Sequence, residues 1–98
     1  MTESTRKEFI ARLKDKLDQA DERIDELERK YEQASGEARQ EFRERLDDVR
    51  EQRDRARGKL QDLRDAGDER WQGMKEEAEH VWKAMRNSFH YFQSHFRD

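Results

Sequence analysis

The sequence lacks cysteine and proline altogether, and only 4 of its 98 residues are glycine. A chain without cysteine forms no disulfide, no thiolate zinc site and no thiol nucleophile. A chain without proline holds no residue that forces a helix to break. No stretch approaches the ~20 apolar residues of a transmembrane helix. Residues 1–16 also hold no apolar run, which predicts no signal peptide. We therefore expect a soluble, cytoplasmic protein.

Large apolar side chains are scarce as well. Leu, Ile, Val and Phe together supply 15 of the 98 residues, a share below the ~20% at which disorder becomes the expectation. Disorder usually goes with a large net charge, whereas 22 basic and 25 acidic residues here leave only −3. Ala, Glu, Lys, Leu and Arg make up 50 residues, which is typical of long helices and coiled coils. This composition argues against a β-sandwich, a Rossmann domain or a thick globular core.

Apolar residues recur at steps of three and four along three segments. The first run comprises Ile10, Leu13, Leu17, Ala20, Ile24, Leu27, Tyr31 and Ala34. The second comprises Ala38, Phe42, Leu46, Val49, Arg53, Ala56, Leu60 and Leu63, with one slip near Phe42. The third comprises Trp71, Met74, Ala78, Val81, Met85, Phe89, Phe92 and Phe96, with Trp82 beside them. Such steps are typical of amphipathic helices that pack through a heptad seam.

Two glycine-containing breaks separate these runs. At the first, either Gly36 takes a left-handed conformation that stops a helix, or Ser35 caps a new one. At the second, we expect Gly67 to end the preceding helix and Asp68 to cap the next. The breaks predict helices over about 5–34, 36–65 and 69–96.

The predicted fold is a single all-α domain over residues 1–98, an antiparallel coiled coil or three-helix bundle that forms homo-oligomers. An isolated helical glycine costs only ~1 kcal/mol, so one continuous helix over 5–63 is an alternative. If the first turn straightens, two chains can exchange segments as an antiparallel dimer. Arg53 lies in the seam. Either its stem packs while its head reaches solvent, or it meets an acid on a partner helix and fixes register.

Two sets of residues are candidates for interaction. The interaction seam comprises Ile10, Leu13, Leu17, Ile24, Leu27, Leu46, Val49, Leu60 and Leu63. The aromatic face comprises Trp71, Met74, Val81, Trp82, Met85, Phe89, Phe92 and Phe96. No acid occurs from His80 to Arg97, so the last helix is basic, aromatic and amphipathic. Such a helix either fills a bundle core or lies on an anionic membrane surface.

Signals of catalysis and of cofactor binding are weak. His80, His90 and His95 lack the i, i+4 spacing of a metal site on one helix, and we expect them on polar faces. No glycine-rich phosphate loop occurs, and thin helices offer little burial to shift the pKa of a carboxyl group. We expect no enzyme, no cofactor, no metal site and no small-molecule substrate.

Nucleic-acid binding is also not expected. Four arginines lie between residues 50 and 57, but Glu51 and Asp54 interrupt them and the net charge is negative. A nucleic-acid-binding helix normally carries a cleaner basic stripe.

The residues resemble a small bacterial family of coiled-coil stress-response proteins of about this length. The resemblance rests on 9–13, 24–27, 66–68, Trp71 and Trp82, and extends to about residue 86. It implies neither a cofactor nor catalytic residues. The chain departs from the family at Gly36, which favours a turn there, and in a tail richer in Phe and His.

The sequence therefore predicts a non-enzymatic, stress-related coiled-coil protein that acts by self-assembly or interaction. The alternative is a peripheral membrane protein that binds through its aromatic last helix.

Overall fold

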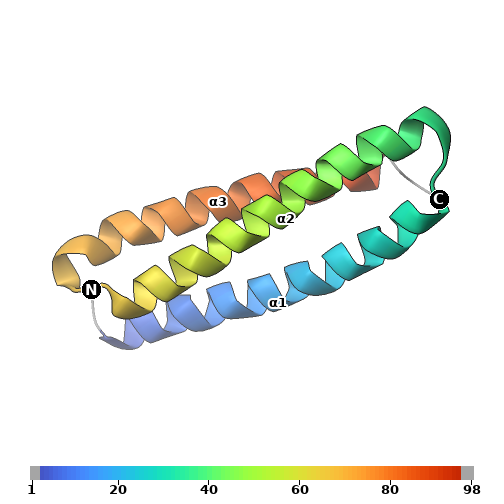
Figure 1. Ribbon diagram of the computed structural model, residues 1–98. Coiled ribbons are helices and arrows are strands. Elements are labelled where there is room, and N and C mark those ends of the chain that lie inside the picture. The colour runs from blue at the N-terminus through green and yellow to red at the C-terminus, as the bar shows by residue number, and fades with distance from the viewer. Residues whose placement is uncertain (1–2, 96–98) are drawn as a thin grey trace.

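A computed structural model describes residues 3–95, except for the side chain of Glu3. These residues form α1 (Glu3–Gln33), α2 (Gly36–Asp65) and α3 (Asp68–His95) (Figure 1). The first two predicted ranges differ from these bounds by at most two residues. The predicted end of the third, residue 96, lies outside the described residues. Between residues 3 and 95 the chain contains no strand, so the fold is an all-α three-helix bundle, as predicted.

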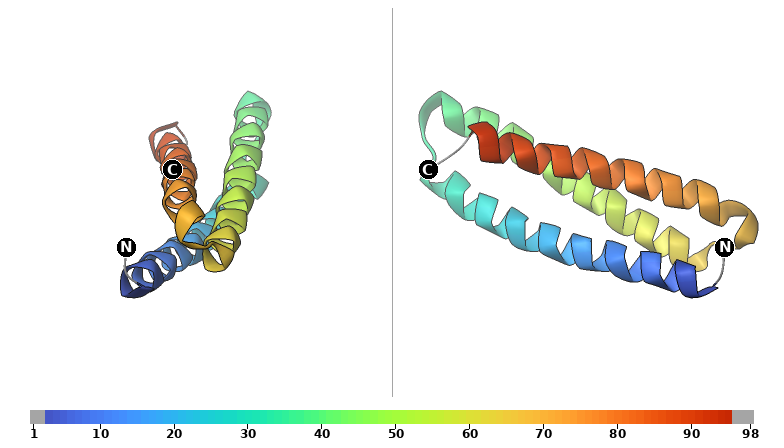
Figure 2. Two further views of the ribbon diagram at one scale, coloured as in Figure 1. Left: turned by 90° about the vertical axis from the view of Figure 1, so that its left-hand side faces the viewer. Right: turned by 180° about the vertical axis from the view of Figure 1, so that it is seen from behind.

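The three helices run up, down and up along one rod. α1 and α3 point in the same direction, and α2 runs against both (Figures 1 and 2). The rod measures 51 × 19 × 18 Å. At 1.5 Å per residue, the 31 residues of α1 span about 46 Å, so each helix runs nearly the full length. The radius of gyration, 15.6 Å, exceeds the ~13 Å of a compact chain of this size, as expected for a rod.

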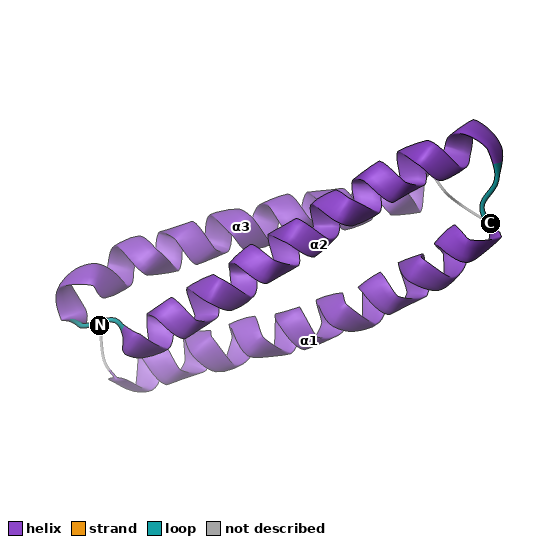
Figure 3. Ribbon diagram, in the orientation of Figure 1, coloured by secondary structure: helices purple, strands orange, loops and turns teal. Residues whose placement is uncertain are grey.

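The turn between α1 and α2 consists of Ala34 and Ser35 (Figure 3). Gly36 has φ +67°, a left-handed conformation that glycine adopts without the steric cost of a Cβ. The Ala34 N–H donates to the Tyr31 carbonyl at 3.1 Å, which closes the last turn of α1. The backbone of Ser35 is extended and its side chain forms no capping hydrogen bond. The left-handed glycine is thus confirmed. The chain folds back at this turn, an arrangement that we call the closed chain, and the alternative of one helix over 5–63 is wrong for it.

The turn between α2 and α3 differs from its prediction. Ala66 is extended (φ −73°, ψ 136°) and already leads the chain out of α2. Gly67 therefore needs no left-handed conformation, and among the described glycines only Gly36 has a positive φ. The Gly67 carbonyl accepts from the N–H groups of Arg70 (3.2 Å) and Trp71 (3.1 Å). Gly67 thus occupies the capping position, and Asp68, predicted as the cap, is the first residue of α3.

All three helices contribute to one apolar core. Its buried residues are Leu13, Leu17, Ala20, Ile24, Leu27, Phe42, Leu46, Val49, Ala56, Leu60, Leu63, Trp71, Ala78, Met85, Phe89 and Phe92. Partly buried residues that pack on it include Phe9, Ile10, Tyr31, Met74, Val81 and Trp82. No polar or charged residue of the described segment is buried, so the heptad seams supply the interior and the charged residues cover it.

Candidate functional site

The interaction seam lies inside the closed chain. Eight of its nine residues are buried, and Ile10 is partly buried. Of the aromatic face, Trp71, Met85, Phe89 and Phe92 are buried, whereas Met74, Val81 and Trp82 are partly buried. Phe96 lies outside the described residues. The two predicted sets therefore meet each other in one core, and the aromatic side chains face the other helices.

Cations of α1 lie over aromatic rings of α3 along most of the length of the pair. The distances to the ring centroids are 5.5 Å from Arg6 to Trp71, 5.2 Å from Lys16 to Trp82 and 5.5 Å from Arg23 to Phe89. Lys75 reverses the pattern, since its Nζ lies 5.4 Å from the ring of Phe9 on α1. Each contact of this kind contributes about 0.5–1 kcal/mol at an exposed position.

The start of α3 is held to α1 by a denser set of contacts. The rings of Phe9 and Trp71 meet edge to face at 5.6 Å. Arg6 also forms an ion pair with Asp68, in the first turn of α3. An acid there interacts favourably with the helix dipole. These contacts fix the parallel register of α1 against α3 at this end of the rod.

A groove of about 260 Å³ lies between α1 and α3, next to these contacts. Phe9 and Leu13 of α1 and Trp82 of α3 form its apolar floor. Lys16 and Lys75 stand at its walls. Ligand sites between helices of bundles combine an apolar surface with a few convergent polar groups, and this groove has that character. It is the candidate functional site of the closed chain.

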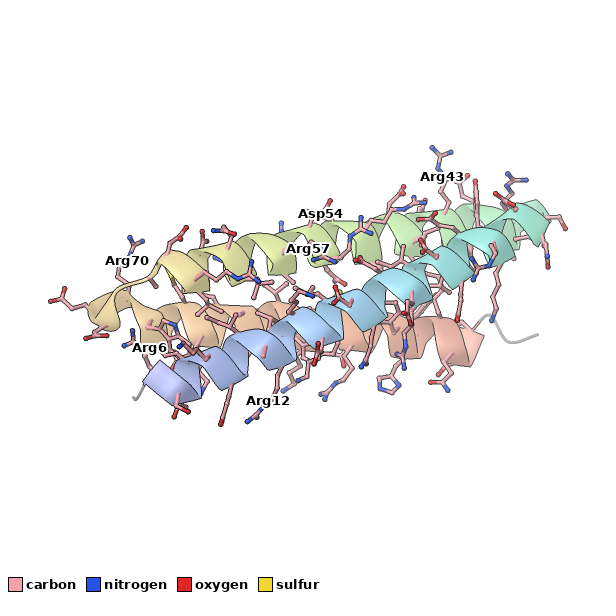
Figure 4. All side chains as sticks on the ribbon, turned by 90° about the horizontal axis from the view of Figure 1, so that it is seen from below. Arg6, Arg12, Arg43, Asp54, Arg57 and Arg70 are labelled. Carbon is pink, nitrogen blue, oxygen red and sulfur yellow. The ribbon has the colours of Figure 1, made fainter. Side chains whose placement is uncertain are left out.

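The other interface of α1, with α2, carries mainly ion pairs around the seam, and Arg39 of α2 also lies 4.7 Å from the ring of Tyr31. Arg50 lies 3.2 Å from Glu28, and Arg53 lies 3.4 Å from Asp21. Arg57 also pairs with Asp21. Figure 4 shows Arg57 reaching toward α1, whereas Arg12 and Arg43 project outward. Of the two interpretations of Arg53, its contact with Asp21 favours the one in which a seam arginine meets an acid on a neighbouring helix.

Ion pairs at and beside this interface shift the pKa values of Asp18 and Arg57. The hydrogen bond from Lys14, with help from the charge of Arg57, lowers the pKa of Asp18. The hydrogen bond to Asp21 raises the pKa of Arg57. Asp18 therefore stays ionised to lower pH than a free aspartate, held by Lys14 of its own helix and by the longer contact with Arg57 of α2.

Polar contacts also join α2 to α3. Lys59 donates to Glu77 at 2.7 Å, and this hydrogen bond lowers the pKa of Glu77. Near the other end, Tyr91 donates to Glu41, which raises the pKa of Tyr91. These groups lie on the surface of the bundle, so the contacts fix geometry and contribute little stability.

Metal binding and membrane crossing receive no support from the described segment. His80, His90 and His95 are exposed, and no group of three or more His, Cys, Asp or Glu side chains in residues 3–95 could hold a metal ion. None of α1, α2 and α3 combines the length and the apolar character needed to cross a bilayer.

Sequence reasoning missed the groove, because it assigned no role to Lys16 or Lys75. Each of these lysines directly flanks a seam position of its helix, which is the available signal. The heptad pattern does not specify which ring each cation would meet.

No protein family, no curated protein and no solved structure gives a significant match to the chain. The resemblance to coiled-coil stress-response proteins therefore stays a prediction.

Proposed function

We propose that the chain is a non-enzymatic, cytoplasmic, stress-related self-assembly module whose copies exchange α1. The observation that carries this proposal is the turn at Ala34 and Ser35. It is short, and it holds Gly36 in a left-handed conformation (φ +67°). Short hinge loops favour exchange of a segment between copies, because the open form replaces a two-residue turn with continuous helix and keeps the packing.

The apolar pattern supports the same proposal, because it continues across the turn with a single slip near Phe42. Tyr31, Ala34, Ala38 and Phe42 follow one another at steps of three, four and four. A helix that ran straight through residues 34–36 would keep these residues on one side. Ala34 and Ala38 are small enough for two such helices to cross closely where their hinges meet. Straightening the turn thus leaves both seams usable.

In the exchanged dimer, α1 of one copy packs on α2 and α3 of the other and makes the contacts of the closed chain. Contact energies then nearly cancel between the two forms. Concentration and the hinge conformation decide the balance. The hinge is therefore the place where a single substitution should shift the equilibrium.

Gly36→Ala is the direct test. In the closed chain, alanine at a left-handed position costs about 1–2 kcal/mol. In the straight helix, alanine is favoured over glycine by about 1 kcal/mol. Both terms favour the exchanged dimer. We expect the variant to show a larger dimer fraction than the native chain by light scattering at equal concentration.

Gly58→Ala is the matched control. Gly58 lies inside α2, and a Cβ there meets nothing within 4 Å. Residue 58 is helical in both forms, so this variant should gain stability without a change in dimer fraction. An equal dimer fraction in the two variants would overturn the proposal.

Solution scattering gives a second criterion. The closed rod is 51 Å long, whereas a straight helix from residue 3 to residue 65 spans about 95 Å. A dimer with a maximum dimension near the larger value, whose fraction also rises with Gly36→Ala, supports the exchanged form. A dimer no longer than the closed rod is made of side-by-side bundles, which contradicts exchange.

Membrane-surface binding is the second candidate. The described part of α3 carries no acid from His80 onward, and Lys83 and Arg86 are exposed on it. Emission of Trp71 and Trp82 with and without anionic vesicles tests this candidate. A blue shift that high salt reverses supports it. Emission that vesicles leave unchanged contradicts it.

A further inference from the structure

The groove between α1 and α3 places two ammonium groups across an apolar floor. Lys16 comes from α1 and lies over the ring of Trp82 on α3. Lys75 comes from α3 and lies over the ring of Phe9 on α1. The two lysines therefore reach across the groove from opposite helices, each toward the ring that the other helix supplies.

The charges around the groove are mostly positive. Its lining includes Lys16, Lys75 and Arg12 as cations and Glu79 as an acid. Glu79 lies 3.9 Å from Lys75, a long ion pair, and Arg12 lies 3.7 Å from Glu8. Both ion pairs are longer than a hydrogen bond. An anion in the groove can therefore form shorter, charge-assisted hydrogen bonds than these cations now make.

The volume of the groove limits the shape of its ligand. About 260 Å³ falls just below the ~300–1,000 Å³ of sites that enclose a drug-sized molecule. A bulky polycyclic ligand is too large. A thin flexible chain can lie along Phe9, Leu13 and Trp82 and continue out of the groove.

We propose that this groove binds a single-chain anionic amphiphile of the fatty-acid class. The carboxylate pairs with the lysines of the groove, Lys16 and Lys75, and the acyl chain covers the apolar floor. This site is independent of segment exchange, because an exchanged α1 forms the same groove against α3 of the partner copy.

Trp82 is a reporter inside the site. The chain has two tryptophans, so Trp71→Phe leaves Trp82 as the sole emitter and keeps an aromatic ring at position 71. Laurate, added below the concentration at which it self-associates, should shift the Trp82 emission in a saturable way. Dodecanol, which has the same chain without the charge, should bind more weakly by about tenfold.

Charge variants on the same background separate recognition from simple attraction. Lys16→Gln with Lys75→Gln should weaken laurate binding about tenfold, since each exposed charge pair contributes up to about 1 kcal/mol. Lys14→Gln with Lys83→Gln removes the same charge from the same two helices, outside the groove, and should leave the affinity near that of the Trp71→Phe chain. Circular dichroism checks that all variants stay helical.

Three outcomes would overturn the proposal. One is that laurate leaves the Trp82 emission unchanged. Another is that both lysine pairs weaken laurate binding equally, which means that net charge alone attracts it. The last is that Trp82 responds to vesicles of phosphatidylcholine and phosphatidylglycerol but not to laurate, which makes a bilayer the occupant.

Discussion

α1 meets its two neighbours through contacts that differ in their main chemistry. Against α2 the contacts are mainly arginines paired with acids, as in Arg50–Glu28 and Arg53–Asp21. Against α3 they are mainly cations over rings, as with Lys16 on Trp82, beside the Arg6–Asp68 ion pair. The interface with α2 joins consecutive antiparallel helices through a two-residue turn. The interface with α3 joins helices far apart in sequence, which run parallel (Figure 2). The groove lies between these two helices.

In both interfaces, stability and specificity come from different contacts. An exposed ion pair contributes about 0–1 kcal/mol, and an exposed cation–aromatic contact contributes about 0.5–1 kcal/mol. Burying one leucine contributes about 1.5–3 kcal/mol, so the shared seam supplies most of the stability of both interfaces. The flanking contacts determine which helix lies where and in which register.

The largest effect should come from a residue in the shared core of both interfaces. Leu17 is 0% exposed, and Leu17→Asp places an unpaired charge there. We expect loss of cooperative folding, measured by circular dichroism during heating. Leu17→Met keeps the volume and should cost less than about 1.5 kcal/mol. If Leu17→Asp melts like the native chain, Leu17 is not part of the folded core in solution.

The next effect should be confined to the interface with α3. Trp71 is 2% exposed, so Trp71→Ala should lower the free energy of unfolding by about 3–5 kcal/mol. Trp82→Ala should cost less, because Trp82 is partly exposed beside the groove. Urea unfolding followed by circular dichroism measures both, with Trp71→Phe as the control for shape. Equal losses from the two alanine variants would contradict the position of Trp82 at the groove.

The sequence predicted the helices and the core well, because heptad spacing reports directly which side of a helix is buried. It favoured the first turn, since Gly36 interrupts an otherwise helix-forming segment, but it left one continuous helix over 5–63 open. It did not predict the role of Gly67, because glycine occurs both after one helix and before the next. Here Ala66 already turns the chain, so Gly67 takes the second role.

The candidate groove was beyond sequence reasoning for a physical reason. Sliding one heptad helix past another by seven residues keeps the seam in place. The pattern therefore leaves open which cation of α1 meets which ring of α3. Only the register of the folded bundle brings Lys16 to Trp82 and Lys75 to Phe9.

A smaller effect should be specific to the interface with α2. Arg53→Leu removes the contact with Asp21 but leaves an apolar side chain in the seam. We expect unchanged helicity and a change in unfolding free energy within about 1 kcal/mol, measured with urea. The difference in unfolding free energy between Arg53→Leu and the native chain should be smaller at high salt, because salt screens exposed pairs. A loss of several kcal/mol would mean that Arg53 contributes far more than an exposed ion pair.

The smallest expected effect is a dependence of stability on pH through the carboxyl group of Asp18. The pKa of Asp18 is lowered in the folded chain by Lys14 and Arg57. Its stabilising contribution is therefore present above the unfolded pKa, about 3.9, and disappears as the pH falls through the lower folded value. The cation–aromatic contacts that join α3 to α1 contain no carboxyl group. Melting temperatures from pH 7 to 2 should show Asp18→Asn slightly less stable than the native chain at pH 7 and equal to it at the acid end. Asp48→Asn, at an exposed site on α2, controls for the loss of one negative charge. If Asp18→Asn differs from the native chain by the same amount at every pH, the ionised carboxylate of Asp18 adds no stability through Lys14 or Arg57. The ion pairs beside α2 would then determine geometry alone.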